Sequence, residues 1–235
     1  MREKMETLRE EIIDLAVEQA ETEALVRHIA ENLSFHGAKI KHKSIRLSMK
    51  DLGEVSDDFF VKLSSENPLL QIETENATSL ILKYMPNYEE NERGLTNLLI
   101  ELGIWNKITN QNKGQLYDSG GTVKFADGSK KEPDITYILR SELKLIPQKS
   151  FITVTPTFVV EWFSTYDDLE EVQAKMNFYM KQGVKLAWLI VPQHSQTYIY
   201  RPEKEVKAIP FSENLTGEDV LIGFEVNIAS LLSEE

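Results

Sequence analysis

Apolar residues follow two patterns along the chain, and each pattern predicts a different kind of element. Where they recur every three or four residues we expect helices, and where they form short, nearly continuous runs we expect strands. Helices are predicted to begin at Ser56, to run from Glu89 to about Ile108, and to run from Leu169 to Gln182. Strands are predicted over residues 69–72, 79–84, 134–139, 157–163, 184–191 and 197–201. This order predicts an α/β fold in which helices flank a mixed β-sheet.

Residues 5–33 carry a third pattern, a seven-residue repeat typical of a helix with one apolar stripe. Gln19 and Thr22 occupy the two middle positions of the stripe and interrupt it. A dimeric coiled coil and a helix folded back on the rest of the chain both fit this pattern, and we favour self-association. We therefore divide the chain into an N-terminal amphipathic helix, residues 1–37, and a main domain, residues 38–235. The remaining stripe positions are Met5, Leu8, Ile12, Leu15, Val26, Ile29 and Leu33.

The composition is that of a folded globular protein, with 41% apolar and 27% charged residues. The absence of cysteine excludes disulfides, thiolate metal sites and cysteine nucleophiles. No apolar run is long enough for a membrane span, and the charged N-terminus is unlike a signal peptide. We therefore expect a cytoplasmic protein without a membrane partner.

The formal net charge of −12 argues against a broad basic surface for nonspecific binding to nucleic acid. One basic run stands out, from His36 to Lys50. It is either an arm that contacts phosphates, or a solvated linker or edge strand. We favour the second interpretation, because runs of charge are commonly just exposed to solvent.

Glu161 is the candidate for chemistry, because it interrupts the apolar run from Thr157 to Phe163. A carboxylate in a buried strand must be paired, protonated or bound to a metal. Asp134 begins another strand, and two carboxylates from neighbouring strands can bind one Mg²⁺ or Mn²⁺ ion. Lys175 lies on the helix that follows and can approach the same site. This set suits phosphodiester hydrolysis, although Asp134 could equally cap a turn and Lys175 could lie on the helix surface.

These residues resemble the PD-(D/E)xK restriction-endonuclease-like superfamily and, more closely, its bacterial Uma-type family of restriction endonucleases. The resemblance extends from about Leu47 to Leu232. It rests on the order of several short stretches: residues 67–73, 116–119, 127–134, 156–161, 173–176 with Tyr179, 183–190, 198–202 and 223–224.

The resemblance implies a restriction-endonuclease-like core in which Asp134 and Glu161 bind the metal. It implies Lys175 as the family lysine, moved to the helix from the strand position that Phe163 occupies here. It also implies an upstream acidic residue, for which we choose Glu90, with Glu89 and Glu92 as alternatives.

We therefore expect a Mg²⁺- or Mn²⁺-dependent endonuclease that hydrolyses DNA and forms a homo-oligomer through its N-terminal helix. The alternative is a catalytically inactive, nuclease-like binding or assembly protein that acts through the same helix. Two departures from the family pattern motivate the alternative. Thr157 and Val191 stand where the family commonly has aspartates that border the site.

Overall fold

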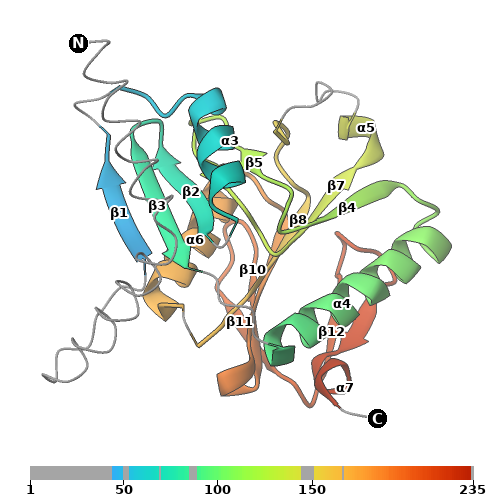
Figure 1. Cartoon of the computed structure of the whole chain (residues 1–235). Coiled ribbons are helices and arrows are strands. Elements are labelled where there is room, and N and C mark those ends of the chain that lie inside the picture. The colour runs from blue at the N-terminus through green and yellow to red at the C-terminus, as the bar shows by residue number, and fades with distance from the viewer. Residues whose placement is uncertain are drawn as a thin grey trace, which may run out of the picture. The chain divides into compact units, whose positions relative to one another are not determined.

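The computed structural model describes residues 44–49, 53–68, 70–84, 89–143, 151–165 and 167–233, without the side chains of Ile45, Tyr84 and residues 89–92. The chain divides into two compact units, residues 1–86 and 87–235. Figure 1 labels the helices and strands of each unit. The predicted N-terminal helix and the predicted boundary at residue 37 lie outside the described residues. Within those residues, no helix is both long and apolar enough to cross a bilayer.

In the first unit, helix α3 (Asp57–Glu66) accompanies a three-stranded antiparallel sheet. The strand order in this sheet is β1 (Ser44–Ser48), β3 (Ser79–Tyr84) and β2 (Leu70–Asn76). The Ser56 hydroxyl caps α3 by accepting a hydrogen bond from the backbone N–H of Phe59, as its position before an apolar helix predicts. Strand β1 is an edge strand formed by part of the basic run, and its Arg46 forms an ion pair with Glu75.

The second unit is built on a six-stranded sheet with the order β11-β10-β9-β8-β7-β4. Only β8 and β9 run parallel, and every other neighbouring pair is antiparallel. The predicted mixed sheet is therefore confirmed. In chain order the strands are β4 (Gly114–Asp118), β7 (Ile135–Leu139), β8 (Phe158–Trp162), β9 (Leu186–Val191), β10 (Gln196–Tyr200) and β11 (Lys207–Pro210).

Helices α4 (Glu89–Ile108) and α6 (Leu169–Lys181) cover opposite faces of this sheet. Successive side chains of a strand point to opposite faces. Val160 and Trp162 of β8 accordingly pack in the apolar cluster that contains α4 residues. Val159 packs in the cluster that contains α6 residues. Glu161 shares the face of Val159 and is therefore directed toward α6.

Short elements complete the second unit. Strands β5 (Val123–Lys124) and β6 (Lys130–Lys131) form a hairpin around Asp127-Gly128, a pair of residues that favours hairpin turns, and Gly128 has a φ of +83°. The sequence patterns did not predict the others: α5 (Arg140–Leu143), a 3₁₀ turn at Pro192–His194, β12 (Asn214–Thr216), β13 (Glu225–Asn227) and α7 (Ile228–Leu232).

Helix α4, which packs on the sheet, is hydrogen-bonded to the C-terminal segment. The side chains of Arg93, Asn97 and Trp105 donate hydrogen bonds to the backbone carbonyls of Leu232, Leu231 and Ile222, each at 3.0 Å. Each bond joins residues more than a hundred positions apart in the sequence.

Gly114 and Gly103 provide a matched test of how closely the second unit is packed. A Cβ atom on Gly114 would lie 2.1 Å from the Tyr137 ring, whereas a Cβ on Gly103, within α4, would meet nothing within 4 Å. We expect Gly114→Ala to lower the free energy of unfolding by about 1–3 kcal/mol through overpacking. Gly103→Ala should raise it by about 0.5–1 kcal/mol, since alanine favours the helix. Urea unfolding of both variants checks this, and equal effects would contradict the described approach of β4 and β7.

Candidate active site

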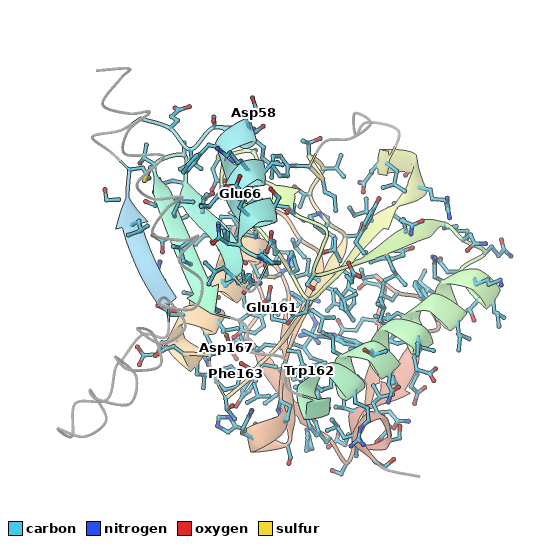
Figure 2. All side chains as sticks on the ribbon, in the orientation of Figure 1. Asp58, Glu66, Glu161, Trp162, Phe163 and Asp167 are labelled. Carbon is cyan, nitrogen blue, oxygen red and sulfur yellow. The ribbon has the colours of Figure 1, made fainter. Side chains whose placement is uncertain are left out.

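Glu161 lies near the end of β8 and is only 6% exposed. All five residues of β8 are buried, and the other four are apolar. A carboxyl group enclosed in this way is stable only when nearby groups compensate its negative charge or when it carries a proton. Figure 2 labels Glu161 together with Trp162, Phe163 and Asp167, which follow it toward α6.

Asp134 lies beside Glu161 because of the register of β7 and β8. Ile135 pairs with Val160 in this antiparallel ladder, so one further step brings Asp134 opposite Glu161. The carboxylate Oδ2 of Asp134 accepts a hydrogen bond of 2.6 Å from the backbone N–H of Trp162. Asp134 and Glu161 therefore occupy neighbouring positions on adjacent strands.

Helix α6 contributes two further groups to Glu161. The Lys175 ammonium lies 2.9 Å from Oε1 and 3.0 Å from Oε2 of Glu161. The Tyr179 hydroxyl, one helical turn later, donates a hydrogen bond of 2.6 Å to Oε1. Lys175 also lies 3.4 Å from the backbone carbonyl oxygen of Glu132, two residues before Asp134.

Local sequence signals set the position of α6. The Asp168 carboxylate caps the helix by accepting hydrogen bonds from the N–H groups of Glu170 and Glu171. Gly183, with a φ of +92°, follows the C-terminal end of the helix, where glycine is common because it adopts this conformation without strain. Val172, Met176 and Tyr179 lie on the buried face of the helix. Because Lys175 is next to Met176 and one turn before Tyr179, it lies at the edge of this face and reaches Glu161.

Asp134 is electrostatically unfavourable in its ionised form. Burial and, next in importance, the charge of Glu161 raise its pKa from 3.8 to about 8. Lys175 and the N–H group of Trp162 act in the opposite direction, and Asp167 adds a smaller increase. Asp134 is therefore largely protonated at neutral pH. A divalent cation between the two carboxylates would oppose this shift, because its charge favours the ionised form of Asp134.

The donor set fits a hard cation such as Mg²⁺ or Mn²⁺, because both candidate ligands are carboxylates. Within the described part of the chain, however, His, Asp and Glu side chains form no group of three or more that could hold a metal ion. The protein would therefore supply the ligands from Asp134 and Glu161, with water or substrate oxygens for the rest, as is usual for Mg²⁺.

The structure brings together three of the four predicted site residues: Asp134, Glu161 and Lys175. Glu90 lies in the first turn of α4, and its side chain is outside the described residues. Sequence reasoning missed the contact that Tyr179 makes with Glu161. The available signal was its spacing of four residues from Lys175, which places both side chains on one side of a helix.

Residues 57–229 match the Uma2 family, whose description is "Putative restriction endonuclease". The chain belongs to the Uma2 family. The match begins in the first unit and extends through the whole candidate site of the second.

A solved structure has the same fold as this Uma2 protein. It is the crystal structure of a "putative nuclease belonging to DUF820" from Anabaena variabilis, with a TM-score of 0.59 and 18% sequence identity. The similarity covers 68% of this chain and 89% of the other. No curated protein matches the sequence. The membership and the shared fold confirm the restriction-endonuclease-like core that the sequence motifs predicted.

The raised pKa of Asp134 predicts how folding stability depends on pH. Between pH 3.8 and about 8, the folded protein keeps a proton that the unfolded chain has lost. Stability contributed by this group therefore falls as pH rises through that window. We expect Asp134→Asn, which stays neutral and keeps an acceptor for the Trp162 N–H, to raise the free energy of unfolding at pH 8 by about 1–3 kcal/mol.

Urea unfolding between about pH 5 and 9, without divalent metal, measures this effect. Asp118→Asn is the matched control, because it is the same chemical change at an exposed position. The assignment is wrong if Asp134→Asn loses stability at pH 8, or if its pH profile follows that of the unmodified protein.

Proposed function

We propose that the protein is a nuclease that hydrolyses DNA phosphodiester bonds with Mg²⁺ or Mn²⁺ bound by Asp134 and Glu161. The observation that carries the proposal is the junction of β7 and β8. There, two carboxylates from adjacent strands lie together with one lysine directed at them from α6. Membership of the Uma2 family supports the same conclusion independently of the geometry.

The bound cation would polarise the phosphate and lower the pKa of a water molecule that attacks the phosphorus atom. Asp134 and Glu161 would hold it, and Asp134 would give up its proton on binding. The backbone N–H of Trp162 keeps Oδ2 of Asp134 in place before any metal arrives. The apolar residues of β8 exclude bulk water from behind the carboxylates, which strengthens their interaction with a cation.

Lys175 serves two roles in this proposal. Without the cation, its ammonium compensates the buried charge of Glu161. With the cation bound, it can stabilise negative charge that develops on the phosphate or orient the attacking water. Its side chain is 8% exposed, and the Glu132 carbonyl is a second acceptor, so the ammonium is held at the site.

The active form in this proposal is a homo-oligomer joined by the N-terminal helix, residues 1–37. In a dimer, two copies of the site would act on the two strands of a DNA duplex. A catalytically inactive binding protein is the weaker candidate. Thr157 and Val191 replace aspartates that are common in the family, but Asp134, Glu161 and Lys175 are assembled.

Cleavage of plasmid and single-stranded DNA with Mg²⁺ or Mn²⁺ tests the proposal. We expect Glu161→Gln to lower the rate by at least about 100-fold, because the amide is a poor ligand for a divalent cation. Glu213→Gln, the same change at an exposed residue, should cleave as the unmodified protein does. Equal cleavage by the unmodified protein and the Glu161 variant would identify a contaminating nuclease and refute the assignment.

Lys175→Met separates the two roles of the lysine. Without metal, the variant leaves Glu161 without its cationic partner, and we expect its thermal midpoint to fall. Mn²⁺ should restore the midpoint, since the cation compensates the same charge. Cleavage at saturating Mn²⁺ should remain about 100- to 1000-fold slower, which is typical when one group that stabilises a transition state is lost. Full activity at saturating Mn²⁺ would show that Lys175 only stabilises the fold.

A further inference from the structure

The strand determines where Glu161 lies but not how its carboxylate is oriented. A glutamate side chain has several rotatable bonds, so a fixed Cα leaves the two oxygens free to take different positions. Lys175 does not select one orientation, because its ammonium is almost equally distant from Oε1 and Oε2. Another group must therefore fix which of the two carboxylate oxygens faces α6.

Tyr179 is the group that distinguishes the two oxygens. Its hydroxyl is 2.6 Å from Oε1. A tyrosine hydroxyl carries a single proton and donates it in one direction. The hydrogen bond therefore distinguishes Oε1 from Oε2.

The ring of Tyr179 is itself held in place. The residue is fully buried, and its ring centroid lies 6.0 Å from that of Phe125 and 5.9 Å from that of Phe178. It belongs to the same apolar cluster as Val159 and Met176. The hydroxyl is thus presented to Glu161 from a rigid support, as an effective positioning group requires.

We propose that Tyr179 is a positioning residue that orients Glu161 to share a divalent cation with Asp134. The inference rests on the proposed function for the identity of that cation. Each carboxylate then has one hydrogen-bond donor that fixes its orientation. The backbone N–H of Trp162 holds Asp134, and the Tyr179 hydroxyl holds Glu161. Groups that hydrogen-bond to metal ligands typically contribute 10- to 100-fold in metal affinity or activity.

Titration of the full chain with Mn²⁺ alone tests the inference without any cleavage assay. The electron paramagnetic resonance signal of the free ion measures how much Mn²⁺ is bound. We expect Tyr179→Phe to weaken Mn²⁺ binding by about 10- to 100-fold. Phenylalanine keeps the ring in its contacts with Phe125 and Phe178, so the variant should fold normally.

Tyr200→Phe is the matched control. It removes a hydroxyl from another buried tyrosine of the same cluster and should leave Mn²⁺ binding unchanged. A second readout is the cleavage rate as a function of Mn²⁺ concentration. If Tyr179 is a positioning residue, Tyr179→Phe needs a higher Mn²⁺ concentration for half-maximal cleavage, but its rate at saturating Mn²⁺ stays close to normal. General damage to the fold would instead lower the rate at saturating Mn²⁺.

The outcomes separate this inference from the proposed function. Equal Mn²⁺ affinity of Tyr179→Phe and the unmodified protein would overturn the inference and leave the nuclease proposal standing. Weaker binding by Tyr179→Phe, with no DNA cleavage by the unmodified protein, would support the inference and refute the nuclease. Absence of Mn²⁺ binding to the unmodified protein would overturn both.

Discussion

The burial of one carboxylate in an apolar strand is the constraint on which the site depends. Glu161 is held between β7 and β9 in the middle of the sheet, so water cannot compensate its charge. Lys175 and Tyr179 provide the compensation, and both come from consecutive turns of α6. The rotation of α6 about its axis is therefore determined by polar contacts as well as by its apolar face. Burial and, after it, the charge of Glu161 raise the pKa of Asp134, so the same buried carboxylate also affects its neighbour.

Much of the second unit could be predicted from the sequence, because its central elements carry strong local signals. Strands β8 and β9 are buried on both faces and appear as apolar runs, broken only by Glu161 in β8. Strands β4 and β11 lie at the two edges of the sheet, and several of their residues are partly or fully exposed. They therefore lack the apolar run that identifies a central strand. Strands β12 and β13 have three residues each, too few for any period to appear.

The candidate site was predictable to the extent that its residues depart from their surroundings. Glu161 was conspicuous as a charge in an apolar run, and Asp134 and Lys175 followed from the strand order and the family resemblance. Tyr179 was not identified as part of the site, because a tyrosine on the apolar face of a helix has the pattern of an ordinary core residue. Only the three-dimensional contact shows that its hydroxyl, rather than its ring, is the polar feature. The backbone N–H of Trp162 has no sequence signal at all.

Trp162 also joins the two sides of the sheet. Its backbone contacts Asp134, and its ring lies on the opposite face against α4, where a Cβ atom on Gly94 would come within 2.5 Å of it. The absence of a side chain at Gly94 thus leaves the space that the indole occupies. A larger residue there would have to displace the indole, which is the side chain of the residue whose backbone N–H holds Asp134. One residue thus takes part in two contacts on opposite faces of the sheet, and through it the packing of α4 is linked to the position of the Asp134 carboxylate.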